Sequence, residues 1–123
     1  MRYEIVDATY VLDNLELLPI VDVRPAQMWQ AGHISHARSI ELLAAKEASG
    51  DTAAVFAERF QHAGLHPRDR FIVYCHDGVL AREACDLLAQ RGYAGQKCYA
   101  GSWRDWVSEP LRPIARPVAL DCR

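Results

Sequence analysis

Residues 71–81 are Phe-Ile-Val-Tyr-Cys-His-Asp-Gly-Val-Leu-Ala, and they contain the clearest structural pattern in the sequence. The first four residues are aromatic or β-branched and uncharged, which predicts a buried strand over residues 71–74. A loop is predicted from Cys75 to Leu80, and a helix from Ala81 to Arg91 that is closed by Gly92. A strand, a short loop and a helix in this order are typical of parallel α/β sheets, in which ligands bind beyond the carboxyl ends of the strands.

Strands and helices alternate on both sides of this stretch. Further strands are predicted over residues 3–6, 19–23, 38–40 and 96–99. Helices are predicted over residues 7–15 with Asp7 as N-cap, over 25–31, from 52 to Gly64, and as a short turn over 103–106. Residues 41–51 are expected to be part helix and part loop. The alternation predicts an α/β fold with about five strands in a mainly parallel sheet and helices on both faces.

The composition is that of one globular domain. The chain has 123 residues, of which 50% are hydrophobic and 24% charged, with a net charge of −2. Lys and Arg form no run, so a nucleic-acid partner is not expected. No apolar run approaches the roughly 20 residues of a membrane helix, and the polar N-terminus leads into no signal-like apolar segment, so we expect a cytoplasmic protein. We predict a domain over residues 1–109 and a proline-rich tail over 110–123 that is extended and lies across the domain or is partly free. The oligomeric state is left open.

Cys75 is the candidate nucleophile. It follows the predicted strand directly, and the N–H groups of the loop and of the helix start are expected to point toward its sulfur. Such donors favour an anionic thiolate, which is the reactive form of cysteine. Gly78 gives the loop the conformational freedom to turn these groups inward.

The other cysteines are given no catalytic role. Cys85 falls on the inner face of its helix and Cys98 lies in a strand, so both are expected in the core. Cys122 is predicted to be an exposed thiol of the tail, with a second sulfur relay as the alternative. The cysteines form no Cys-x-x-Cys pair and the histidines have no zinc-finger spacing, so a metal site is not expected.

Three segments together resemble the rhodanese family. Residues 74–81 are similar to its active-site segment, in which Cys is followed by x-x-Gly-Val-x-Ala or Ser. Val-Asp-Val-Arg at 21–24, followed by Gly-His-Ile at 32–34, resembles its upstream Asp-x-Arg and Gly-His-Ile signature. Gly-Ser-Trp-Arg-Asp-Trp at 101–106 is similar to its closing Gly-Ser-Trp-x-x-Trp segment. The three segments occur in the family's order and span most of the chain.

The resemblance implies a sulfurtransferase that works in two steps. Cys75 takes sulfane sulfur from a small donor such as thiosulfate or mercaptopyruvate, and the resulting persulfide passes it to a thiol, cyanide or protein acceptor. No cofactor is implied. The loop backbone at His76, Asp77, Gly78, Val79, Leu80 and Ala81 is expected to bind the substrate. Supporting roles are expected for Asp22 and Arg24, which fix nearby loops, for His33 as a hydrogen-bonding brace, and for Trp103, which packs beside the loop.

The side chains of the loop bear on the choice of donor. Family members that prefer thiosulfate tend to have basic loop residues, whereas this loop has His76, Asp77 and Leu80. Asp77 would repel a dianion by about 1 kcal/mol at the surface. Arg82 is a possible compensating charge, and His76 a possible donor to the substrate or to the persulfide. Thiosulfate is therefore allowed but is not favoured by charge.

Two other functions are considered. Phosphatases of related folds use Cys, five residues and then Arg, whereas the residue after five is here Ala81 and Arg82 comes one position late. The second alternative is a non-catalytic or slow persulfide carrier, or a regulatory binding module. The presence of Cys75 favours the enzyme. Because the loop is only weakly basic, the carrier or binding module is kept as the alternative.

Overall fold

A five-stranded parallel sheet forms the centre of the computed structural model, which describes residues 2–117. The strands are β1 (Glu4–Val6), β2 (Ile20–Asp22), β4 (Arg38–Ser39), β5 (Phe71–Tyr74) and β6 (Gln96–Tyr99), in the order β1-β6-β5-β2-β4. Every neighbouring pair is parallel. The predicted α/β class, strand number and strand direction are confirmed.

Alternation along the central strands divides the core into two layers. Phe71 and Val73 of β5 belong to one buried cluster, together with Cys75 just beyond the strand. Ile72 and Tyr74 belong to the cluster on the opposite face. Successive side chains of a strand point to opposite faces of a sheet, so an uncharged run such as residues 71–74 needs cover on both sides.

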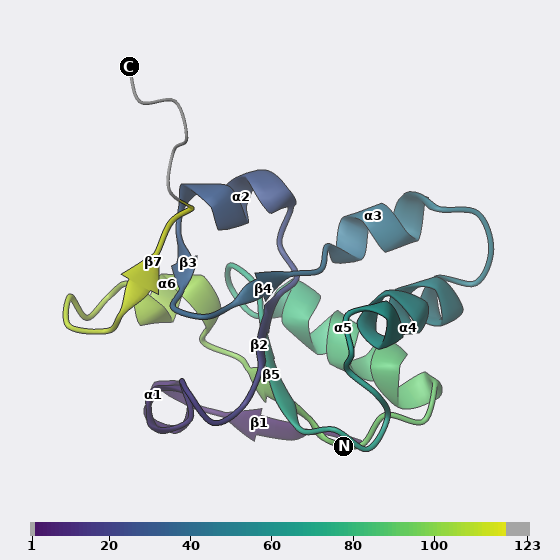
Figure 1. Cartoon of the computed structure of the whole chain (residues 1–123), viewed down its shortest axis with the longest axis horizontal. Coiled ribbons are helices and arrows are strands. Elements are labelled where there is room, and N and C mark those ends of the chain that lie inside the picture. Colours follow the sequence, from purple (N-terminus) through teal and green to yellow (C-terminus); the bar gives the residue numbers. More distant parts are fainter. Residues whose placement is uncertain (1, 118–123) are drawn as a thin grey trace.

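The helices provide this cover (Figure 1). On one side lie α3 (Leu42–Glu47), α4 (Thr52–His62) and α5 (Val79–Gln90), and on the other lie α1 (Ala8–Asp13) and α6 (Ser102–Trp106). A further short helix, α2 (Ala26–Ala31), follows β2. Cys75 faces the side of α3, α4 and α5, because its neighbours in the core belong to that cluster.

Some element ends differ from the predictions. Asp7 caps α1 as expected, since its carboxylate accepts from the N–H of Tyr10 at 2.9 Å. Helix α5 begins at Val79, two residues earlier than predicted, because Gly78 adopts a left-handed conformation with φ +97° and serves as its N-cap. The loop after Cys75 is therefore shorter than the predicted stretch to Leu80. Pro25 is the N-cap of α2 rather than its first residue.

A second, two-stranded sheet was not predicted. Strand β3 (His33–Ile34) pairs antiparallel with β7 (Ile114–Ala115), which belongs to the proline-rich tail. The indole N–H of Trp106 donates to the carbonyl of Pro113 at 2.9 Å, which ties the start of this tail to α6. This part of the tail lies across the domain, one of the two expected arrangements. Cys122 lies outside the described residues.

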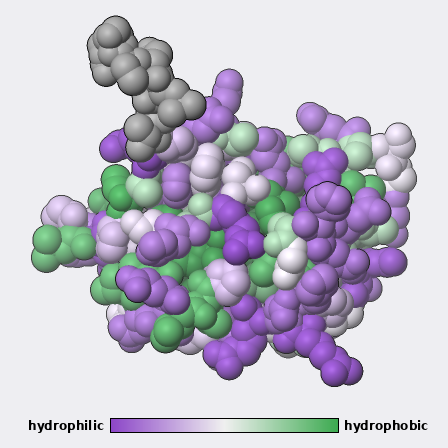
Figure 2. Space-filling model, viewed as in Figure 1, coloured by the Kyte–Doolittle hydropathy of each residue, from purple (hydrophilic) through white to green (hydrophobic). Residues whose placement is uncertain are grey.

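Polar and apolar side chains are unevenly spread over the surface. In Figure 2, hydrophobic residues gather at the left of the face shown, over α1 and the loop that precedes β7. Leu12 of α1 and Leu111 of this loop are among the exposed hydrophobic side chains. Among residues 2–117, no helix has both the length and the apolar character needed to cross a membrane.

Candidate active site

Cys75 lies directly beyond the carboxyl end of β5, and α5 begins four residues later. Its residue is 1% exposed. Two backbone N–H groups point to its sulfur: that of Gly78 at 3.1 Å and that of Ala81 at 3.3 Å. Sulfur thus sits at the N-terminus of a 12-residue helix, where free N–H groups and the helix dipole favour negative charge.

Gly78 is required for this geometry. Its φ of +97° is a conformation that L side chains rarely adopt, and a Cβ at this position would collide with the carbonyl oxygen of Ala100. The close approach of the two backbones lets the loop turn back beneath the sulfur. The sequence prediction that Gly78 supplies conformational freedom is confirmed by its φ.

Within the predicted binding segment the N–H groups differ in what they contact. Those of Gly78 and Ala81 point to the Cys75 sulfur, whereas that of Val79 donates to the carboxylate of Asp77 at 3.2 Å. Asp77 thereby assists the start of α5. A role of this backbone in binding substrate stays a prediction.

Helix α6 holds the other side of the loop. The N–H of Trp103 donates to the carbonyl of Cys75 at 2.9 Å, and that of Arg104 to the carbonyl of His76 at 3.0 Å. The N–H of Cys75 in turn donates to the hydroxyl of Ser102 at 3.1 Å. Trp103 thus contacts the loop through its backbone, whereas its ring lies against Arg24; packing of the side chain beside the loop stays a prediction. Ser102 was not anticipated as a site residue, although it lies in the Gly-Ser-Trp segment just after a strand that neighbours β5.

Asp22 and Arg24 form a buried ion pair beneath the site. Arg24 donates through Nη2 to Asp22 at 2.7 Å and to the carbonyl of Gly32 at 2.8 Å. Arg24 is 2% exposed and Asp22 is 0% exposed. Burial acts to lower the pKa of Arg24, but the hydrogen bonds and the charge of Asp22 raise it above its ordinary value. The hydroxyl of Tyr74 also donates to Asp22, at 2.7 Å. Burial, reinforced by Asp22, raises the pKa of Tyr74. The network joins the ends of β2 and β5, in keeping with a supporting role.

Aromatic rings complete this support. The guanidinium of Arg24 lies 4.7 Å from the ring centre of Trp103, a cation–π contact. The ring of His33 stacks on Trp29 with centroids 4.3 Å apart, and its Nδ1 donates to the Trp29 carbonyl at 2.8 Å. A carbonyl only accepts, so the proton is on Nδ1. His33 is thus placed as the predicted hydrogen-bonding brace.

The exposed side chains around the loop give the site a mixed rim. His76, Asp77 and Val79 are exposed, and Leu80 is half-buried against the core. Arg82 is exposed on α5. Its positive charge acts to lower the pKa of Tyr3, just before β1, and the pKa of Cys98 in β6. The exposed part of the loop is thus partly apolar and partly acidic. The Cys75 sulfur accepts hydrogen bonds from backbone N–H groups rather than from an arginine.

The two remaining described cysteines are core residues, as predicted. Cys85 and Cys98 are fully buried. Contact with the Cys98 thiol, together with burial, raises the pKa of Cys85, so it remains a neutral thiol. Among residues 2–117, no three His, Cys, Asp or Glu side chains are grouped to hold a metal ion.

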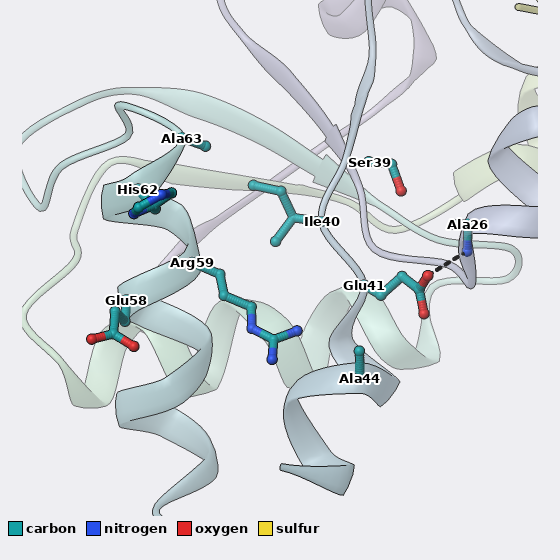
Figure 3. Close-up of a pocket in the computed structure, with 9 residues that line it drawn as sticks. All are labelled: Ala26, Ser39, Ile40, Glu41, Ala44, Glu58, Arg59, His62 and Ala63. Atoms are coloured by element: carbon teal, nitrogen blue, oxygen red, sulfur yellow. Dashed lines mark hydrogen bonds between the residues drawn. The ribbon is translucent and has the colours of Figure 1, made fainter.

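A cavity of about 790 Å³ lies apart from Cys75, between α4 and the segment that links β4 to α3 (Figure 3). Glu58, Arg59 and His62 of α4 line one side, and Glu41 lines the other, where it accepts from the N–H of Ala26 at 2.9 Å. The lining contains no cysteine. The candidate nucleophile is therefore not part of this cavity.

Comparisons with known proteins point to one family. The model of the rhodanese-like domain matches residues 7–109. A "Probable 3-mercaptopyruvate sulfurtransferase" of Pseudomonas aeruginosa is 39% identical over 49 residues, which are 40% of this chain and 17% of that protein. The mouse protein "Thiosulfate sulfurtransferase/rhodanese-like domain-containing protein 3" is 27% identical over 96 residues, 77% of this chain and 61% of that protein.

The fold is also found among solved structures. The human single-domain sulfurtransferase TSTD1 superimposes with a TM-score of 0.68 at 24% identity, covering 85% of this chain and 95% of that one. At this identity the likeness establishes the fold alone.

Proposed function

The chain belongs to the rhodanese-like domain family, and from this premise we propose that it transfers sulfane sulfur through a persulfide on Cys75. Its relatives include proteins named as sulfurtransferases. The chain spans 17% and 61% of the length of the two curated relatives compared above. The proposal is therefore argued from the residues of this chain and not from the activity of the relatives.

One observation supports the proposal above all. The N–H groups of Gly78 and Ala81 lie 3.1 and 3.3 Å from the Cys75 sulfur, at the start of a helix. Backbone donors stabilise a thiolate without adding a side-chain charge, and thiolate is the form that attacks sulfur. A neutral buried cysteine that only filled space would not need them.

The proposed reaction has two displacement steps. With thiosulfate, the Cys75 thiolate attacks the outer sulfur, an S–S bond forms to Cys75, and the donor's S–S bond breaks to release sulfite. In the second step the acceptor attacks the outer sulfur of the persulfide, and the Cys75 thiolate leaves. With cyanide the product is thiocyanate, and the enzyme returns to its starting form. With mercaptopyruvate, the Cys75 thiolate attacks the thiol sulfur and the C–S bond breaks, so that pyruvate leaves as its enolate and takes up a proton on carbon. The electron pair of the C–S bond stays with the leaving pyruvate, so neither donor needs an external oxidant or reductant.

The rim of the site favours donors and acceptors of low negative charge. Asp77, two residues after Cys75 in the sequence, is exposed. Val79 is an apolar residue of the same segment and is 67% exposed. We therefore propose mercaptopyruvate, a monoanion, ahead of thiosulfate, a dianion. A thiol or protein acceptor in the cytoplasm fits the same rim, and both the acceptor and the location stay predictions.

The test is the mass of the intact protein after incubation with each donor. A gain of about 32 Da, the mass of one sulfur atom, that is lost on addition of cyanide supports the proposal. The same treatment of Cys75→Ala should give no gain. No gain with any donor in the unmodified chain would contradict the proposal.

A slow persulfide carrier is the second candidate, favoured by the closed position of Cys75. With 1% of the residue exposed, the donor reaches its sulfur only after the surrounding chain moves. Single-turnover loading and steady-state turnover with cyanide separate the two candidates. Formation of the Cys75 persulfide without steady-state production of thiocyanate indicates the carrier. Steady-state production of thiocyanate at the rate of persulfide formation indicates the enzyme.

A further inference from the structure

Ser102 occupies an unusual place next to Cys75. It is fully buried at the start of α6 and has a φ of +60°. The left-handed conformation costs a non-glycine residue about 1 kcal/mol. A backbone held in such a region is a reason to look for a function in the side chain it positions.

The hydroxyl of Ser102 has three partners within reach. It accepts from the backbone N–H of Cys75 at 3.1 Å, and it lies 2.9 Å from the carbonyl of Tyr99 and 3.7 Å from the Cys75 sulfur. A serine hydroxyl has one proton, so it donates to either the carbonyl or the sulfur at a given moment. A neutral thiol is a weak acceptor, so the Ser102 hydroxyl then donates to the carbonyl of Tyr99. An anionic sulfur is a stronger, charge-assisted acceptor.

We propose that Ser102 is a positioning residue that turns its O–H from Tyr99 to Cys75 whenever the Cys75 sulfur is anionic. The inference rests on the proposed sulfur transfer for its role in turnover, but its contacts exist without any donor. The proton remains on Ser102 throughout, so no bond to hydrogen breaks. The hydroxyl would be a third donor to the sulfur beside the N–H groups of Gly78 and Ala81.

The two steps of the transfer would use this donor differently. In the first step the thiolate is the nucleophile, and its population at neutral pH rises with each donor. In the second step the same thiolate is the leaving group, and a more stable thiolate leaves faster. Loss of the Ser102 hydroxyl should therefore slow the discharge of a preformed persulfide.

Other titratable groups surround the sulfur and must be separated from this effect. The loop contributes His76 and Asp77, α5 contributes Arg82 and Cys85, β6 contributes Cys98, α6 contributes Arg104, and the Asp22–Arg24 pair is joined to Tyr74 next to Cys75. Histidine is the side-chain type that changes charge near neutral pH, so His76 needs a control of its own. Each comparison is therefore repeated in a His76→Gln background, where a shift caused by Ser102 persists.

The experiment is the pH profile of Cys75 alkylation by iodoacetamide. Trypsin places each cysteine on a separate peptide, and residues 71–82 contain Cys75 alone, so the reaction at this site is followed by mass. Ser102→Ala removes the hydroxyl and keeps Cβ, whereas Ser102→Gly also fits the left-handed backbone. Both should move the midpoint of the profile up by about half to one pH unit and keep the plateau at high pH. Ser108→Ala, which removes an exposed hydroxyl two residues beyond the end of the same helix, should leave the midpoint unchanged.

A second readout follows the persulfide itself. Discharge by cyanide should slow about two- to threefold in both Ser102 variants, as expected for a poorer leaving group. Unchanged midpoints in both variants would overturn the inference, as would a shift in Ser102→Ala alone, which would indicate backbone strain instead. If no donor forms a persulfide but the midpoints shift, the proposed function fails and the role of Ser102 stands.

Discussion

The charge of Asp77 is the residue-scale feature that bears most directly on the donor. Its carboxylate accepts from the N–H of Val79 and remains exposed. Asp77→Asn keeps an acceptor for the helix start and removes the charge. We expect persulfide formation from thiosulfate to accelerate about three- to fivefold at low salt, with a smaller change for mercaptopyruvate.

The matched control for this charge is Asp51→Asn. Asp51 caps α4 by accepting from the N–H of Ala53 at 3.0 Å, so the same change is made at a remote helix. Equal acceleration in both variants, or none in Asp77→Asn, would show that Asp77 does not act on the donor. Loading rates at two salt concentrations provide the measurement.

Gly78 gives a prediction of stability and function together. In Gly78→Ala the left-handed φ and the collision with the Ala100 carbonyl act at once. We expect a loss of at least about 2 kcal/mol in the free energy of unfolding and little persulfide formation. Gly64→Ala is the control, because Gly64 has φ +85° but open space around its Cβ position, and it should cost about 1 kcal/mol with normal loading. Urea unfolding that ranks the two variants equally would contradict this account.

At the scale of elements, the strands of the central sheet could be predicted, including the two-residue β4, whereas the β3–β7 pair could not. Residues 71–74 are recognisable because strands buried on both faces need a continuous apolar run. Strands β3 and β7 have two residues each, and two residues show no period. Their pairing joins segments about 80 positions apart, which local sequence does not specify.

The site shows the same division. Cys75 and its backbone donors follow from a strand, a glycine and a helix that are adjacent in sequence. Ser102 contacts Cys75 only because β6 lies beside β5, so its hydroxyl was found from the structure. The early start of α5 at Val79 depends on the left-handed Gly78 and on the Asp77 carboxylate, and neither its φ nor its hydrogen bond is visible in helical periodicity.

The pairing of β7 leads to a prediction for the tail. A chain ending at residue 109 loses β7, the Pro113 carbonyl bound by Trp106, and the contact of Arg116 with the Ala31 carbonyl. We expect it to lose about 1–3 kcal/mol of stability, since a buried indole N–H loses its partner. A chain ending at residue 117 keeps all three features and serves as the control. Equal melting temperatures for the two would show that β7 adds nothing to the fold.

At the scale of the whole molecule, the buried tyrosines contribute to the response of stability to alkaline pH. Burial first, and Asp22 second, raise the pKa of Tyr74 above its ordinary value, so the folded protein keeps this proton where the unfolded chain loses it. The contribution is therefore fully present below about pH 10 and is lost as pH rises further. Burial and Asp105 shift the pKa of Tyr99 in the same direction.

We expect the free energy of unfolding to fall above pH 10 by about 1.4 kcal/mol per pH unit for Tyr74. Tyr74→Phe should be less stable at neutral pH, because Asp22 and the N–H of Ile34 lose a partner, yet fall less steeply above pH 10. Urea unfolding from pH 8 to 11 provides the comparison. Parallel curves for the two proteins would contradict the assignment to Tyr74.

Sulfur that is transferred through Cys75 can be followed with a label. The outer sulfur of thiosulfate, or the sulfur of mercaptopyruvate, is labelled, the protein is loaded and digested without reductant, and the cysteine peptides are counted separately. We expect about one label per chain on the peptide of residues 71–82, released as thiocyanate when cyanide is added. Label on the peptide that contains Cys122, or no label from either donor, would contradict it.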